Sequence, residues 1–202
     1  MKILRQSVVV AALLLLASPA LAQAPQVQRV RGTIEKLDGN TLMVKERGGQ
    51  SVSIKLADNY TVRGMAKKSL SDIKAGDYVA STGRKGPDGK LHAVEVRIFP
   101  EAMRGVGEGQ FPWDLTPDST MTNATVTQVA AAPQGQTLKV KYKGEESEFI
   151  VDPNVPVLTY IPGDKSLLKP GSMVFVIANK QPDGSLTSGN VTAETNGIKP
   201  PM

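Results

Sequence analysis

Few residues in this sequence have the types and spacing that catalysis or metal binding requires. The chain has one histidine, His92, and no cysteine, so it can form neither a Cys–His nucleophile pair nor a thiolate metal site. Asp72 and Asp77 lie close together in the sequence, but an acid–base pair needs one desolvated partner. We interpret both as turn and capping groups, and a hydrolase-type enzyme using them is the weakest alternative. The sequence therefore predicts no catalytic residue, no metal site and no cofactor.

Basic residues form two groups in the first half of the chain, which is the more basic half. Such groups attract anionic surfaces, for example a lipid headgroup or an envelope polysaccharide. Nucleic-acid binding would also need aromatic platforms beside them, and aromatic residues are few, so we expect no nucleic-acid partner. The candidate contacts for an anionic ligand are Arg63, Lys67, Lys68, Arg84, Lys85 and Lys90.

The segment 101–122 is rich in Gly and Pro and has little periodicity, which is typical of a linker. It also contains Phe111 and Trp113, and Trp113 is the single tryptophan of the chain. Large aromatic side chains contribute much of the energy of cores and interfaces. We therefore expect Trp113 to pack against one or both flanking modules and to set their relative orientation. A ligand-stacking surface at Phe111 and Trp113 is the alternative.

The N-terminus has the pattern of a secretory signal peptide at 1–22. Two basic residues precede an apolar run from Val8 to Ala17, and small residues follow up to a cleavage site near Ala22. The run is shorter than the roughly 20 residues of a membrane span. We expect a periplasmic or secreted protein with a flexible leader at 23–28 and no transmembrane segment after signal removal.

An internal repeat organises the rest of the chain. The stretch from Ser69 to Val79 returns in altered form from Ser166 to Val174, and Pro-Asp-Gly follows each copy at the same offset. The second copy keeps the apolar pair and the glycine but loses the acidic residues. We therefore interpret the stretch as a short helical turn that plugs the end of a small barrel.

Alternation of apolar and polar residues predicts five short strands in each copy. Three strands come first, then an irregular stretch around Tyr60 and Val62 in the first copy, then the helical turn and two more strands. This is the order of an OB-type barrel, and a small barrel of other topology is the alternative. We predict an all-β fold of two tandem OB-like barrels, at 29–100 and 123–195, each with a helical turn between strands 3 and 4. A flexible tail is expected at 196–202.

These motifs resemble those of a family of exported bacterial proteins of unknown function, built from small OB-like β-barrel modules. The resemblance rests on Gly-Thr-Ile at 32–34, on Ser-Leu-Ser-Asp-Ile-Lys-Ala-Gly-Asp-Tyr-Val at 69–79 and on Asp-Gly-Lys-Leu at 88–91. The Pro-Trp-Asp motif of the linker is similar to longer members, whereas the second copy departs from the pattern at Ala124 and Ser172. The resemblance implies a fold and a compartment but no activity.

These observations favour a non-enzymatic, exported envelope binding or scaffold module. Its partner is expected to be an unknown envelope protein or an anionic polymer. The main alternative is a binder of an anionic envelope component, either a glycan or a lipid headgroup, that uses the basic loops of the first barrel.

Overall fold

The computed structural model describes residues 26–201, so the expected signal peptide and its cleavage site lie outside the described residues. Regular structure in this part consists of β-strands and short 3₁₀ turns, which confirms the all-β class. The strands are β1 (Gln26–Asp38), β2 (Thr41–Glu46), β3 (Ser51–Lys68), β4 (Tyr78–Lys85), β5 (Leu91–Ile98), β6 (Gly109–Trp113), β7 (Ser119–Ala131), β8 (Gln136–Tyr142), β9 (Glu145–Val151), β10 (Val157–Pro162), β11 (Met173–Lys180) and β12 (Leu186–Ala193). The 3₁₀ turns are η1 (Leu70–Asp72), η2 (Glu101–Met103) and η3 (Lys165–Leu167).

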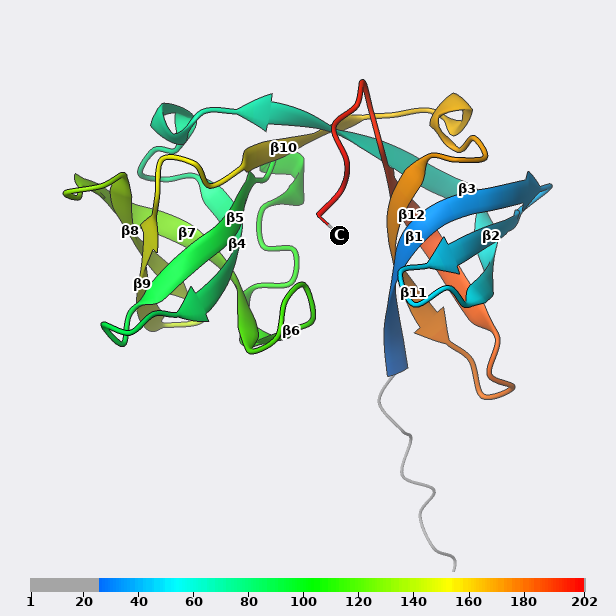
Figure 1. The fold of residues 1–202 in the computed structure, drawn as a ribbon, viewed down its shortest axis with the longest axis horizontal. Helices are drawn as coiled ribbons and strands as arrows, with labels where there is room; N and C mark the ends of the chain where they lie inside the picture. The colour runs from blue at the N-terminus through cyan, green and yellow to red at the C-terminus, as the bar shows by residue number, and fades with distance from the viewer. Residues whose placement is uncertain (1–25, 202) are drawn as a thin grey trace, which may run out of the picture.

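Ten of these strands close into two five-stranded barrels, which lie side by side (Figure 1). Barrel A has the strand order β1–β2–β3–β12–β11, and β11 pairs with β1 to close it. Barrel B has the order β7–β8–β9–β5–β4, and β4 pairs with β7 to close it. Within each barrel one contact is parallel, β3 with β12 or β5 with β9, and the others are antiparallel.

Each barrel takes strands from both copies of the repeat. Barrel A combines the first three strands of the first copy with the last two strands of the second copy, and barrel B does the reverse. The prediction that 29–100 and 123–195 each form one barrel is therefore wrong about which strands close together. The number of strands in each barrel is as predicted.

The long strand β3 causes this exchange. The stretch around Tyr60 and Val62, expected to be irregular, continues as a strand in which both side chains are buried. Its backbone pairs with β12 up to Arg63, and residues 63–68 then pair with β10. Strands β3 and β10 run side by side from one barrel to the other (Figure 1). Because β3 does not turn back, η1 and β4 are placed in the opposite barrel.

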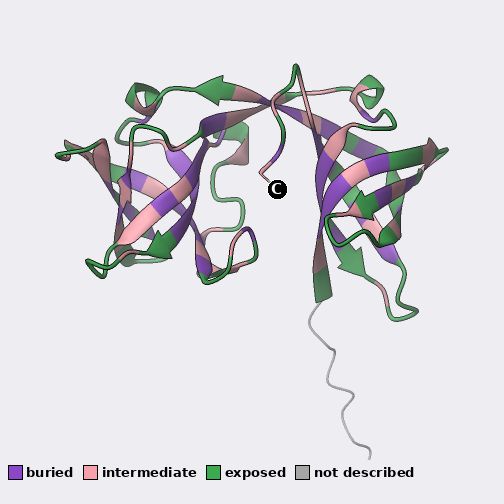
Figure 2. Cartoon of the chain, viewed as in Figure 1, coloured by how far each residue is buried: buried purple, intermediate pink, exposed green. Residues whose placement is uncertain are grey.

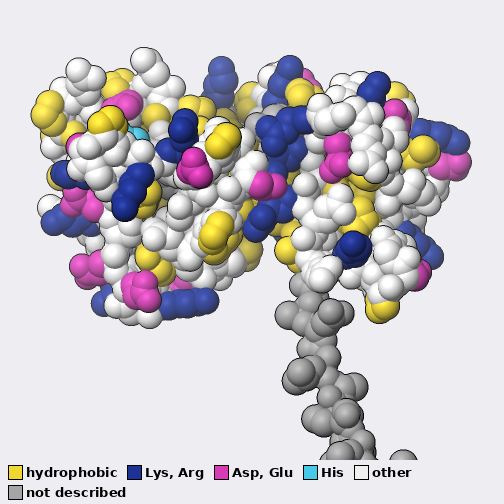
Figure 3. Space-filling view, turned by 60° about the horizontal axis from the view of Figure 1, so that its bottom comes forward, with side chains coloured by type: hydrophobic (Ala, Val, Ile, Leu, Met, Phe, Trp, Pro, Cys, Tyr) yellow, Lys and Arg dark blue, Asp and Glu magenta, His cyan; other side chains and the backbone are white. Residues whose placement is uncertain are grey.

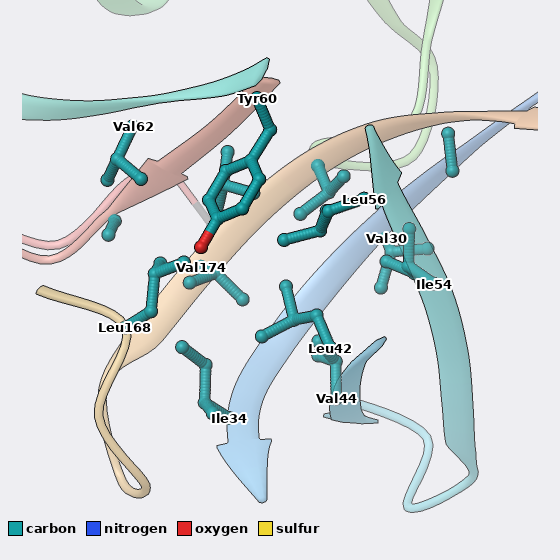
Figure 4. Packing of buried hydrophobic residues seen from close by; sticks show 14 of the residues in the cluster. Val30, Ile34, Leu42, Val44, Ile54, Leu56, Tyr60, Val62, Leu168 and Val174 are labelled. Carbon is teal, nitrogen blue, oxygen red and sulfur yellow. The ribbon is translucent and has the colours of Figure 1, made fainter. Parts of the chain in front are cut away.

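The two helical turns plug barrel ends as predicted, but each plugs the barrel opposite to the strands that precede it. Leu70 and Ile73 pack into the core of barrel B, and Leu167 and Leu168 pack into the core of barrel A. Figure 4 shows Leu168 among the core side chains of barrel A. The glycine after each plug has a φ near +90°, a left-handed conformation that favours glycine.

Alternating side chains along the strands fill the two cores. Buried and exposed residues alternate along the barrel strands in Figure 2. In barrel A, the inward positions hold branched aliphatic residues such as Ile34, Leu42 and Ile54, each almost fully buried. Full burial of one such side chain contributes roughly 1.5–3 kcal/mol. Each core thus joins side chains from both copies of the repeat.

The predicted linker and both predicted flexible ends contain regular structure. Residues 26–28 of the leader belong to β1, and the linker at 101–122 contains η2, β6 and the start of β7. The tail turns back through Thr195 and Ile198, which form a β-bridge, and Pro200 is buried. Residues 196–201 therefore lie between the barrels (Figure 1). Across residues 26–201, no helix has the length and apolar composition needed to cross a membrane.

Candidate functional site

A cleft of about 470 Å³ lies between the two barrels. One wall is the outer face of β1, β11 and β12 in barrel A. The other wall is the outer face of β4, β5 and β7 in barrel B, extended by β6 and β10. Each wall therefore combines the first strand of one copy with the last two strands of the other. The volume falls within the range of roughly 300–1,000 Å³ that is usual for small-molecule sites.

Exposed apolar side chains gather at this cleft. Val27, Val106 and Ile177 are the large hydrophobic residues that the described part of the chain exposes most, at 53%, 51% and 49%. All three line the cleft. Gathered exposed apolar surface marks an interaction site in a water-soluble domain. Five aromatic residues line the same cleft, and they are Phe99, Phe111, Trp113, Tyr160 and Phe175.

Trp113 connects barrel B with barrel A. Its strand, β6, pairs with β7 of barrel B. On the other side, the indole meets Phe175 of barrel A edge-on, with ring centroids 6.2 Å apart, and the Arg29 guanidinium lies 4.2 Å from its centroid. Phe111 packs against the indole from its own strand at 6.0 Å. The half-buried indole is thus held between the two barrels by aromatic and cation–π contacts.

A buried ion pair lies on the barrel B wall. Arg97 Nη2 lies 3.0 Å from Glu95 Oε1, and Arg97 Nη1 donates a 2.8 Å hydrogen bond to the Tyr160 hydroxyl. Thr82 donates a further bond of 2.8 Å to the Glu95 carboxylate. Burial disfavours the charged guanidinium, but the Glu95 carboxylate and Tyr160 outweigh it and raise the pKa of Arg97. Arg97 therefore stays positively charged, and its charge is compensated within the protein by Glu95.

Arginines on the barrel A wall differ in how their charge is compensated. Arg31 is buried and donates a 2.8 Å bond to the Asp114 carboxylate, which also lies 4.0 Å from Arg29. Arg63 lines the cleft at the crossing strand β3 and has no carboxylate partner among residues 26–201. Arg63 thus supplies positive charge that the described part of the chain does not neutralise.

Three buried polar atoms on the barrel B wall lack hydrogen-bond partners among the described residues. They are Asn123 Oδ1, Arg97 Nε and Glu95 Oε2, and Asn123 and Arg97 line the cleft. A buried polar atom without a partner costs roughly 1–3 kcal/mol. The Asn123 amide nitrogen, in contrast, donates to the carbonyls of Val106 and Gly107 at the cleft rim. Such buried groups need a partner, which can be an ordered water, an ion or a ligand.

The six basic residues predicted as anion contacts do not converge on one surface. Arg63 is the member that lines the cleft. Lys67 and Lys68 are exposed at the end of β3, whereas Arg84 and Lys85 end β4. Lys90 stands in the β4–β5 turn of barrel B, where its Nζ lies 3.6 Å from Glu148. The structure therefore divides these residues among separate surfaces.

Asp72 and Asp77, the two carboxylates considered for catalysis, accept hydrogen bonds from backbone amides. Asp72 is exposed and accepts a 2.7 Å bond from the Ser69 amide, and this bond lowers the pKa of the Asp72 carboxyl. Asp77 accepts a 2.8 Å bond from the Lys74 amide. Neither carboxylate is desolvated as a general acid would have to be. These bonds cap and close the turn around η1.

The remaining polar candidates do not assemble into a metal site. His92 Nε2 lies 3.2 Å from the Asp88 carboxylate beside the β4–β5 turn. Within residues 26–201, no group of three or more His, Asp or Glu side chains could hold a metal ion.

Several residues that line the cleft were not identified from the sequence, although the strand pattern around some of them could have indicated this surface. Val27 shares the outward parity of β1 with Arg29 and Arg31, and Ile177 lies on the outward parity of β11. An apolar residue on the polar side of a strand is the pattern that could have indicated this surface. Val106 lies between η2 and β6 and has no such periodic signal.

In comparison with known protein families, a domain of unknown function, DUF5666, covers residues 31–97. The match agrees with the expected resemblance to a family of unknown function. It spans most of the first copy, from β1 to β5, so the matched unit contributes strands to both barrels. Searches of the curated proteins and of the solved structures each found no match.

Proposed function

We propose that this protein is a non-enzymatic, exported envelope binding module whose ligand site is the cleft between the barrels. One observation carries the proposal: the three most exposed large hydrophobic side chains of the described residues all line this cleft. Exposed apolar surface costs free energy in water, and a bound partner recovers that cost. The strand exchange supports this proposal, because strands β3 and β10 join the two walls directly.

We further propose that both barrels are OB-like, with the fourth and fifth strands exchanged between the copies. Counted along each closed barrel, the strands follow the order 1-2-3-5-4, and a helical turn precedes the fourth strand. OB-type proteins bind oligonucleotides over strands 2 and 3. In barrel A, β2 and the first part of β3 carry no aromatic residue on which bases could stack. In barrel B, the aromatic residues of β8 and β9, Tyr142 and Phe149, are buried in the core. The proposed ligand site is therefore the cleft, and nucleic acid is not the proposed partner.

Trp113 provides a direct test, because it is the single tryptophan and lines the cleft. Mature protein would be titrated with fractionated envelope extract while its indole fluorescence is recorded. We expect a saturable change with at least one fraction, and the Ile177→Asn variant should weaken that binding. Ile150→Asn is a matched control, since Ile150 lies on the outer side of β9 and outside the cleft.

Three outcomes would contradict the proposal. The first is the absence of a saturable change in indole fluorescence with every fraction. The second is equal loss of binding in both isoleucine variants, because the cleft would then have no special role. Turnover of a glycan, ester or phosphate substrate, lost on mutation of a single residue, would instead show an enzyme.

A further inference from the structure

We infer that the cleft takes an amphipathic anion, with an apolar body between the barrels and a carboxylate or phosphate head at Arg63. This inference rests on the proposed binding function and adds the chemical class of the ligand. It follows from three properties of the cleft, namely its charge, the polar groups near Arg63 and the position of its apolar side chains.

The charge of the lining favours an anion over a cation or a neutral ligand. Arg29, Arg63 and Arg97 line the cleft, and no Asp or Glu is among the lining residues. Glu95 compensates Arg97, whereas Asp114 is bound by Arg31 at 2.8 Å and lies 4.0 Å from Arg29, so it compensates Arg29 only in part. Arg63 is the cleft arginine with no carboxylate partner among the described residues, and its planar guanidinium can bind a carboxylate or phosphate in a bidentate manner.

Polar side chains on β12 extend the surface beside Arg63. Thr192 is its direct neighbour across the β3–β12 pairing. Asn190 uses its Oδ1 to accept a 2.6 Å bond from Thr61, so its amide nitrogen keeps its donors for another partner. Asn179 also lines the cleft, farther along β11 and opposite Val27. Arginine, amide and hydroxyl donors together suit the several acceptor oxygens of an anionic head group.

The apolar side chains of the cleft require that the ligand also has an apolar part. Val27 and Ile177 lie on neighbouring strands of barrel A, and Val106 stands at the opposite rim with Phe111. In Figure 3, hydrophobic side chains and Lys or Arg side chains both appear around the junction of the barrels. A purely ionic ligand would leave the exposed valines and isoleucine in water. An alkyl or aryl body would cover them.

Four synthetic probes separate these contributions. Decanoate and decyl phosphate carry both an apolar chain and an anionic head, decanol carries the chain alone, and acetate carries the head alone. Binding would be measured below micelle-forming concentrations by calorimetry and by Trp113 fluorescence. We expect decanoate or decyl phosphate to bind roughly tenfold or more tightly than decanol, since hydrogen bonds to charged groups are about twice as strong as neutral ones. The ratio of the affinities for decanoate and decyl phosphate distinguishes a carboxylate head from a phosphate head.

Arg63 variants locate the head group. Arg63→Gln should reduce the affinity for the preferred anion to near that for decanol and should leave decanol binding unchanged. Arg63→Lys keeps the charge without the bidentate geometry and should retain part of the preference. Arg84→Gln is the matched control, because Arg84 is an exposed arginine of barrel B outside the cleft. Thermal melts of each variant confirm that the fold is intact.

The inference is overturned if decanol binds as tightly as both anions, or if the preference for an anion survives in Arg63→Gln. It is also overturned if no probe binds while an envelope fraction still changes Trp113 emission. In each of these cases the cleft remains a binding site and the proposed function stands. Loss of the envelope signal itself is the separate result that removes the proposed function.

Discussion

Strand exchange between the two copies predicts that Gln26 and Lys180 can be joined by an engineered disulfide. These residues lie directly opposite each other in the antiparallel β1–β11 pair, and both are exposed. Opposed residues in such pairs have Cα atoms about 4.5–5.5 Å apart, which fits the roughly 4.4–6.8 Å that a disulfide needs. The chain has no cysteine, so the double variant Gln26→Cys/Lys180→Cys has no competing thiol.

The expected stabilisation follows from the length of chain that the crosslink closes. The loop includes most of the described chain, and the chain-entropy relation gives about 5 kcal/mol for a loop of roughly 150 residues. For a protein of this size, each kcal/mol raises Tm by about 2–4 °C, so an upper value is roughly 10–20 °C. Strain in the bond would reduce this shift.

The control tests the barrel arrangement predicted from the sequence. Lys85 occupies in the first copy the position that Lys180 occupies in the second, and it lies on β4 of barrel B. If each copy closed its own barrel, Gln26 would face Lys85. Under mild oxidation, non-reducing gels and mass measurement should therefore show an intramolecular crosslink in Gln26→Cys/Lys180→Cys and none in Gln26→Cys/Lys85→Cys. The reverse pattern, or a crosslink that joins two molecules, would refute the exchange.

Two further predictions concern stability. Trp113→Ala should lower the free energy of unfolding by about 2–4 kcal/mol in denaturant titrations, because the edge contacts of the ring and its Arg29 contact are lost. This is less than for a fully buried indole, because the ring is half-buried. Trp113→Phe should lower the free energy of unfolding by less, and a Trp113→Ala variant that melts like the parent would show that the indole does not hold the barrels together. Burial chiefly raises the pKa of Tyr78 to about 12. Its neutral form therefore stabilises the fold fully below the unfolded pKa of about 10, and that stability is lost as pH rises toward 12. In an ultraviolet titration Tyr78 should ionise at a higher pH than an exposed tyrosine. The Tyr78→Phe variant should lack this component of alkaline destabilisation. Reversible ionisation of Tyr78 near the ordinary tyrosine pKa of about 10 would contradict its burial.

Local features of the fold could be predicted because they depend on neighbouring residues. Period-two alternation indicated the strands, and Gly after Asp or Asn indicated the turns. The plug was readable because its second copy keeps Leu167, Leu168 and Gly171 while losing the acidic side chains. Residues 57–68 were misinterpreted as irregular, although Tyr60 and Val62 already show the spacing of a buried strand.

The candidate site was less accessible from the sequence. Arg63 and Trp113 were singled out, but for separate surfaces, and the other basic candidates lie elsewhere. The cleft exists because outward-facing positions of two barrels oppose each other, and a strand pattern shows only which side of a strand faces its own core. Arg29, Arg97 and Ile177 meet across this space only after the chain has folded.

The sequence by itself determined the all-β class, most of the strands and the two short turns whose apolar residues pack into the barrel cores. Tertiary structure decided which copy's strands close each barrel. Buried apolar residues occur along β4 and β5 and along β11 and β12, so the alternation alone does not assign either pair of strands to one barrel. The choice depends on whether β3 turns back or continues, and its long pairing with β12 and β10 makes it continue. That same continuation places two outer faces opposite each other and so creates the cleft.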